Sequence, residues 1–141
     1  MRYYLDTNIL VYMLFDRDEL HRDTKAILGD ESNLFMTSAV CAAELIHLIQ
    51  IGKIHVRGQK DNGKACAIAI QHLDDFGIAI VPVDERHLGT LAALPLYDDH
   101  RDPADRLIVA QAIADRVPLV SSDGKFDRYV RHGLDFVLNE R

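Results

Sequence analysis

Short apolar runs alternate with longer stretches of helical periodicity along the whole chain. Five of these runs predict strands, at residues 3–5, 34–36, 78–83, 118–121 and 134–138. The stretches between them predict helices at residues 8–15, 21–28, 38–51, 64–76, 84–94 and 103–116, with a turn and a short helix at 124–130. Strands that alternate with helices and are themselves continuously apolar are typical of a parallel sheet covered on both faces. We therefore predict an α/β fold with three layers, α/β/α, around a central, mainly parallel sheet.

Residues at the ends of these elements support the boundaries. Asp102 followed by Pro103 is a strong helix start, because Asp accepts hydrogen bonds at the N-cap and Pro fits the first helical position. The β-branched run at residues 78–83 predicts a buried strand. Three glycines and several charged residues between Gly52 and Gly63 predict a loop, whose role the sequence does not indicate.

Length and composition favour one globular domain. The chain has 141 residues, of which 48% are hydrophobic, and we expect a single domain over residues 1–141. No apolar run is long enough to cross a membrane, and Asp6 and Asp16 interrupt any signal-peptide core. Cys41 and Cys66 are isolated, a spacing that leaves a disulfide open but favours free thiols. We therefore expect a cytoplasmic protein that does not bind membranes.

Four acidic residues stand where an acid is locally unfavourable. They are Asp6, after the run at 3–5; Glu44, inside the apolar stretch 39–46; Asp105, before the apolar stretch 107–110; and Asp123, after the run at 119–122. Carboxylates are rarely buried unless they are paired or bound to a metal. Because the carboxyl ends of parallel strands meet at one edge of a sheet, we expect Asp6 and Asp123 to lie on the same edge. If all four acids meet there, divalent cations must offset their repulsion.

Three of the four acids also have an ordinary structural interpretation. Asp6 is placed to cap the helix that follows it, Asp105 to complete a capping box with Asp102, and Asp123 to form a turn before a glycine. Glu44 has no such explanation, because its helical neighbours are apolar. The net charge of −6 argues against a protein that coats nucleic acid, but a nuclease with an acidic, cation-binding site remains compatible with it.

The four acids stand in motifs that, taken together, span nearly the whole chain. The motifs are Tyr4-Leu5-Asp6-Thr7-Asn8, the segment from Ser38 to Glu44, His100-Arg101-Asp102-Pro103-Ala104-Asp105-Arg106 with the apolar residues after it, and Leu119-Val120-Ser121-Ser122-Asp123 followed by Phe126. In this order and at these separations they resemble the PIN-domain ribonucleases, in particular the VapC-like toxins of type II toxin–antitoxin pairs. The chain departs from the family pattern at Ala104, where relatives often carry a bulky apolar residue.

The resemblance implies a metal-dependent endoribonuclease that hydrolyses RNA phosphodiester bonds and leaves 5′-phosphate and 3′-hydroxyl ends. One or two Mg²⁺ or Mn²⁺ ions would be held by the catalytic acids Asp6, Glu44, Asp105 and Asp123. Side chains expected to orient these carboxylates or a water molecule are Thr7, Asn8, Asp102 and Ser122. Basic residues placed to contact RNA are Arg101, Arg106, Lys125 and Arg128. The family also implies a cognate antitoxin protein and a homodimer.

Three alternatives remain at this point. The first is a catalytically inactive PIN-like module that binds RNA or a protein, although such a module would be marked by the loss of an acid. The second is a haloacid-dehalogenase-like phosphatase with Asp6 as nucleophile, but that family has a second Asp where this chain has Asn8. The third is a di-iron bundle built on the Glu-x-x-His spacing of Glu44 and His47, but no second such motif occurs and the strands argue against a bundle.

Overall fold

A computed structural model describes residues 1–141 and shows one five-stranded sheet. The strands are β1 (Arg2–Leu5), β2 (Leu34–Ser38), β3 (Ile78–Val81), β4 (Leu119–Ser121) and β5 (Phe136–Leu138). They are ordered β3-β2-β1-β4-β5, and every neighbouring pair is parallel. The predicted parallel sheet is therefore confirmed, with β1 in its centre.

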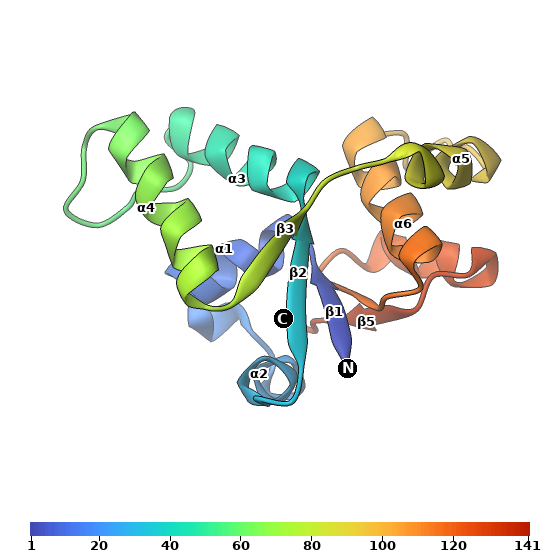
Figure 1. Cartoon of the computed structure of the whole chain (residues 1–141), viewed down its shortest axis with the longest axis horizontal. Coiled ribbons are helices and arrows are strands. Elements are labelled where there is room, and N and C mark those ends of the chain that lie inside the picture. Colours follow the sequence, from blue (N-terminus) through green and yellow to red (C-terminus); the bar gives the residue numbers. More distant parts are fainter.

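Helices cover both faces of the sheet, as predicted for three layers. They are α1 (Thr7–Phe15), α2 (Arg22–Gly29), α3 (Ala39–Gln50), α4 (Asn62–Asp75), α5 (Glu85–Ala93) and α6 (Pro103–Asp115), with short 3₁₀ segments η1 (Arg17–Glu19) and η2 (Gly124–His132). Helices α1, α3 and α4 lie on one side of the sheet and α5 and α6 on the other (Figure 1). Most strands are joined to the next by a helix that crosses over one face of the sheet, and such crossover connections allow neighbouring strands to run parallel.

The central strands are buried because helices pack on both sides of them. Leu5 of β1 and Leu119 and Val120 of β4 have no exposed surface. They belong to one connected core cluster of 27 buried residues, which the continuous apolar runs of the sequence anticipate. Cys41 and Cys66 are free thiols, and no helix is both long and apolar enough to span a bilayer.

The strand predicted to be buried at residues 78–83 differs from that expectation. β3 lies at the edge of the sheet, its residues Ala79 and Ile80 are exposed, and the strand ends at Val81. Pro82 follows and cannot donate to a strand ladder, which accounts for the early end. The position of a strand within the sheet depends on distant partners, so an apolar run alone did not reveal that this strand is at the edge.

The carboxyl edge of the three middle strands gathers segments that are far apart in the sequence. β1 leads directly into Asp6 and α1, β2 ends at Ser38, which caps α3, and β4 leads into Asp123. Backbone hydrogen bonds continue the sheet to this point, because the Asp6 N–H donates to the Val120 carbonyl at 3.0 Å. The N-termini of the helices that follow therefore surround one edge of the sheet.

Candidate metal centre

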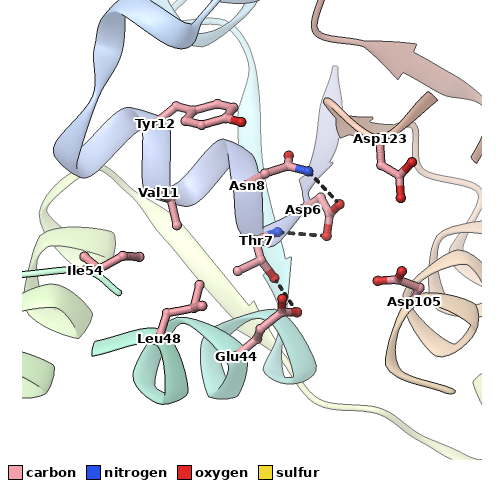
Figure 2. Close-up of a pocket in the computed structure, with 10 residues that line it drawn as sticks. All are labelled: Asp6, Thr7, Asn8, Val11, Tyr12, Glu44, Leu48, Ile54, Asp105 and Asp123. Carbon is pink, nitrogen blue, oxygen red and sulfur yellow. Dashed lines mark hydrogen bonds between the residues drawn. The ribbon is translucent and has the colours of Figure 1, made fainter. Parts of the chain in front are cut away.

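A cleft of about 410 Å³ opens at this edge of the sheet. Its lining consists of Asp6, Thr7, Asn8, Val11, Tyr12, Glu44, Leu48, Ile54, Asp105 and Asp123. Asp6 and Glu44 face Asp105 and Asp123 across the cleft, and Val11, Leu48 and Ile54 form an apolar wall to one side (Figure 2). All four singled-out acids therefore share one cavity, although they come from four different parts of the chain.

Asp6 is the most deeply buried of the four, with 5% of its surface exposed. It caps α1 by accepting from the Thr7 N–H at 2.8 Å, and it also accepts from the Ser121 hydroxyl at 2.7 Å and the Asn8 amide at 3.4 Å. Burial raises the pKa of Asp6 to about 6, and the neighbouring charges of Glu44 and Asp123 act in the same direction against the hydrogen bonds. The capping interpretation is thus correct, but it accounts for only one of the two carboxylate oxygens.

Glu44 reaches the cleft from the second turn of α3. Its carboxylate accepts from the Thr7 hydroxyl at 3.1 Å (Figure 2), and the residue is half-buried. Thr7 therefore connects two of the acids, because its backbone N–H binds Asp6 while its hydroxyl binds Glu44.

Asp105 lies in the first turn of α6, and its carboxylate accepts no hydrogen bond. The helix is capped by Asp102, which accepts from the Ala104 N–H at 2.9 Å, so the capping box proposed for Asp105 does not form. Burial raises the pKa of Asp105 to about 7, and the charges of Asp6, Asp102, Glu44 and Asp123 add to the effect. Asp105 is therefore an acid held among other acids without any donor to compensate it.

Asp123 follows β4 and caps η2, accepting from the Lys125 N–H at 3.0 Å. Its own N–H donates to the Ser121 hydroxyl at 3.1 Å. Like Asp6, it has a structural role and still lines the cleft.

The residues expected to support the acids are only partly in that position. Thr7 and Asn8 hydrogen-bond the acids directly, whereas Asp102 bonds only the helix backbone. The Ser122 hydroxyl accepts from Asn139 at 2.8 Å, and the neighbouring Ser121 is the one that contacts Asp6. Because successive residues of a strand point to opposite faces, the choice between two adjacent serines depends on strand register.

His100 is a member of the cleft region that the sequence analysis gave no role. It is 4% exposed, and its Nε2 lies 3.5 Å from Oδ2 of Asp105. One ligand atom each from His100, Asp105 and Asp123 lies within 4.8 Å of the others. The available signal was its place in the motif that contains Asp102 and Asp105.

The four basic residues predicted near RNA fall into two pairs. Arg106 donates to the Leu94 carbonyl at 3.2 Å, and Arg128 pairs with Asp99, so both guanidinium groups bind within the protein. Arg101 and Lys125 are exposed and form no ion pair. Only the second pair has its charge free for a ligand.

A second cavity, of about 780 Å³, adjoins the first at Ile54. It is lined by residues of the segment between Gly52 and Gly63 and by the flanking ends of α3 and α4. Arg57 and Lys60 line this cavity, Lys53 is exposed in the same segment, and none of the three forms an ion pair. This cationic surface contrasts with the net charge of −6 of the whole chain.

The residues of the cleft suit hard divalent cations. Mg²⁺ and Mn²⁺ prefer oxygen ligands, and four carboxylates supply them. No Lys or Arg forms a salt bridge with Asp6, Glu44, Asp105 or Asp123 within 4.0 Å. Carboxylates that are buried close to one another have raised pKa values until a cation offsets their charge. Asp6 and Asp105 have such raised values.

A family model described as the PIN domain matches residues 3–131, which is most of the chain. The chain belongs to the PIN domain family. No curated protein matches the sequence.

Solved structures share the fold of this PIN domain at low sequence identity. VapBC2 from Rickettsia felis, bound to a promoter DNA fragment, has a TM-score of 0.70 at 20% identity, covering 99% of this chain and 100% of that one. VapBC-1 from nontypeable Haemophilus influenzae has a TM-score of 0.68 at 16% identity, covering 98% of both chains. A toxin–antitoxin complex from Klebsiella pneumoniae has a TM-score of 0.67 at 16% identity, covering 99% of this chain and 98% of that one.

Proposed function

We propose that this PIN domain is a Mg²⁺- or Mn²⁺-dependent endoribonuclease that hydrolyses RNA phosphodiester bonds. The observation that carries the proposal is the meeting of four carboxylates in one cleft, with the pKa of two of them raised. The helix caps made by Asp6 and Asp123 do not require Glu44 and Asp105 to face them without a cationic partner, because the added charges repel. An inactive module would gain nothing from keeping Glu44 and Asp105 in the cleft.

The residues of the cleft would divide the work of holding the ions. When bound, divalent ions supply the Lewis acidity that phosphodiester hydrolysis requires. Asp6 accepts from Thr7, Asn8, Ser121 and the Cys41 thiol and so presents one fixed orientation. The Thr7 hydroxyl holds Glu44 beside it. The apolar wall of Val11, Leu48 and Ile54 leaves room for a ribose or base beside the acids.

RNA, rather than another phosphodiester, is the substrate that the family motifs imply. Arg57 and Lys60 of the cationic surface line the cavity that adjoins the cleft at Ile54, and their charges complement a nucleic-acid backbone. It would let a net acidic protein approach a polyanion from one side. Arg101 and Lys125 are the further cations with free charge.

We also propose that the protein is the toxin of a toxin–antitoxin pair, which acts as a homodimer and binds a cognate antitoxin protein. The support is the similarity of its fold to chains of toxin–antitoxin complexes from three bacteria. Co-expression with the product of an adjacent small open reading frame, followed by purification of the complex, tests this part. Expression of the protein alone should slow growth, and co-expression of that product should restore it.

The nuclease proposal is tested by incubating the purified protein with structured and unstructured RNA in Mg²⁺, Mn²⁺ or EDTA. Cleavage is expected only with a metal and only in the wild type, not in Asp6→Asn, and mass spectrometry should find 5′-phosphate and 3′-hydroxyl ends. The matched control is Asp74→Asn, which changes an exposed acid of α4 outside the cleft. DNA of the same sequence tests the choice of substrate, and cleavage that persists in EDTA or in Asp6→Asn would contradict the proposal.

The cationic surface is tested by RNA binding rather than by cleavage. Asp6→Asn is expected to bind RNA without cutting it, so its affinity for single-stranded RNA is followed against salt concentration. If Lys53, Arg57 and Lys60 each contact a phosphate, changing all three to Gln lowers the slope of log affinity against log salt by about 2. An unchanged slope would show that the RNA takes another path.

A further inference from the structure

The ring of His100 is held firmly beside the acids. It lies in the loop before α6 with 4% of its surface exposed, and it packs edge to face against Phe126 and Tyr129, each with a centroid distance of 5.4 Å. This packing fixes the direction of both ring nitrogens. Nδ1 faces away from the cleft towards Tyr129, and Nε2 faces Asp105.

The two polar neighbours of the His100 ring favour one position for its proton. Nδ1 of His100 lies 2.7 Å from the Tyr129 hydroxyl oxygen. On the opposite side of the ring, Nε2 faces the carboxylate of Asp105. A phenol hydroxyl can donate or accept, whereas a carboxylate only accepts, so Tyr129 can donate to Nδ1 while the ring proton points at Asp105. In a neutral ring whose Nδ1 accepts, the proton is on Nε2.

The Nε2 of His100 is then a buried donor with no hydrogen-bond partner. Its nearest acceptor is Oδ2 of Asp105 at 3.5 Å, beyond good hydrogen-bond distance, and Asp105 itself accepts no hydrogen bond. A donor and an acceptor that both lack partners therefore face each other at the edge of the cleft.

The same arrangement is complete elsewhere in the protein. Nδ1 of His87 accepts from the Asp84 N–H at 2.9 Å, and Nε2 lies 3.0 Å from both oxygens of Asp115. His87 thus shows a histidine of this chain with one nitrogen satisfied by an outside donor and the other directed at a carboxylate.

We propose that His100 is a positioning residue, present as its Nε2–H tautomer, that donates to Asp105 and so fixes which carboxylate oxygen faces the ions. Tyr129, on the side of the ring away from the cleft, would set this tautomer by donating to Nδ1. The role in holding ions rests on the proposed function, whereas the tautomer does not. The rival role for the same nitrogen is a metal ligand, which requires a lone pair on Nε2 rather than a proton.

The tautomer is tested on the metal-free wild type by ¹⁵N NMR of the histidine rings, with the His100 signals assigned by their loss in His100→Gln. The expected pattern is a protonated Nε2 and an unprotonated Nδ1. Tyr129→Phe removes the outside donor and should weaken or reverse this preference. A proton found on Nδ1 in the wild type overturns the proposal.

The positioning role is tested by Mn²⁺ affinity, followed by EPR, in two variants. His100→Met removes the donor and should lower the affinity about 10- to 100-fold, the usual effect of losing a residue that supports a metal ligand. His100→Gln places an amide N–H near the former Nε2 and should retain most of the affinity. His72→Met, at an exposed histidine of α4, is the matched control.

Pulsed EPR of the Mn²⁺-loaded protein separates the two roles of His100. No nitrogen coupling from this ring is expected, and a coupling that disappears in His100→Gln would identify a ligand and overturn the proposal. Equal affinity of His100→Met and the wild type would also overturn it. If the wild type binds no ion at all, the proposed nuclease function fails instead, and the NMR result still decides the tautomer.

Discussion

The two ends of α6 carry acids in opposite situations. Asp105 lies in the first turn, where the helix dipole favours a negative charge, yet its pKa is raised to about 7. Asp115 is the last residue, where the dipole disfavours a negative charge, yet its pKa is lowered. The helix dipole alone therefore predicts the wrong direction of the pKa shift for both acids.

Hydrogen-bond partners explain why both pKa shifts are opposite to the effect of the helix dipole. Asp115 accepts from the Tyr4 hydroxyl at 2.5 Å and Arg86 at 2.9 Å, and it lies 3.0 Å from His87. Burial alone would raise its pKa, but these three donors outweigh burial. Asp105 has no donor and several acids around it. A dipole contributes about 0.3–1 kcal/mol, whereas hydrogen bonds to charged groups contribute about 1.5–3 kcal/mol each, so the partners decide.

This contrast separates an acid that stabilises the fold from one that is kept for a ligand. The Asp115 cluster is saturated by the protein itself, and the Asp105 cluster is left incomplete. Matched Asp→Asn changes at the two ends of one helix can test that distinction.

The largest difference is expected in RNA cleavage. Asp105→Asn should lower the initial rate with Mn²⁺ by at least about a hundredfold, since losing a ligand costs no less than losing a residue that supports one. Asp115→Asn should cleave at nearly the wild-type rate per folded molecule. Rates are measured below the melting temperature of the weaker variant, and equal losses in both variants would contradict the contrast.

Folding stability should show the reverse order. Asp115→Asn places an amide among three donors and should lower the free energy of unfolding by about 3 kcal/mol. Asp105→Asn should be neutral or stabilising in metal-free buffer, because it removes a charge that has no partner. Urea denaturation of both variants in EDTA measures the difference. Clear destabilisation by Asp105→Asn would restore a structural role for that acid.

Asp6→Asn is not an equivalent test of charge repulsion. Asp6 accepts from Thr7, Asn8 and Ser121, and an amide in its place would turn a donor towards one of these donors. Relief of repulsion and loss of hydrogen bonds would therefore offset each other.

Metal binding should stabilise only the proteins with an intact cleft. At an ion concentration one hundred times the Kd, Mg²⁺ or Mn²⁺ should add about 2.7 kcal/mol to the free energy of unfolding. Asp115→Asn should gain the same increment and Asp105→Asn much less. Thermal melts with and without metal measure it, and an equal gain in Asp105→Asn would place the ion elsewhere.

The smallest of the expected effects is the change with pH in the folding stability of the metal-free protein. The pKa of Asp105 is raised to about 7 from an ordinary value of 3.8, so the folded state holds this proton more tightly than the unfolded state. The resulting stability is fully present below the ordinary value and is lost as pH rises towards 7. Asp115 behaves oppositely, since its lowered pKa contributes stability that is lost only as pH falls below the ordinary carboxyl range.

Melts between pH 4 and 8 in EDTA should therefore show a loss of about 1 kcal/mol with rising pH, after allowance for the partial exposure of Asp105. Asp105→Asn should reduce this slope to the part contributed by Asp6, whose pKa is also raised, and Asp115→Asn should keep the whole slope. A slope that persists unchanged in Asp105→Asn would assign the titration to another group.

The sequence predicted the elements well where the signal is local. Asp102 and Pro103 mark the start of α6, because one caps the helix and the other fits its first position. The run that forms β4 is continuously apolar because both faces of this strand are buried. Glu44 was recognisable because no local role fits an acid at its position. Each of these inferences depends on neighbours within a few residues.

The features that were missed depend on distant contacts. Ser121 rather than Ser122 supports Asp6 because strand register turns it towards the cleft, and the bond spans 115 residues of sequence. Arg106 resembles a surface cation in the motif, yet it binds the carbonyl of Leu94 in the preceding loop. His100 gains its place from Phe126 and Tyr129, which follow it by more than twenty residues.

The central place of β1 determines when activity can appear during synthesis. The first strand made is flanked by β2 and by β4, so it waits for Leu119–Ser121 before its second neighbour exists. Until residue 123 has left the ribosome, Asp6 lacks Ser121 and the cleft lacks one of its four carboxylates. A nascent chain, or one terminated before residue 123, therefore lacks the complete set of acids, and the proposed nuclease can act only after most of the chain has been made.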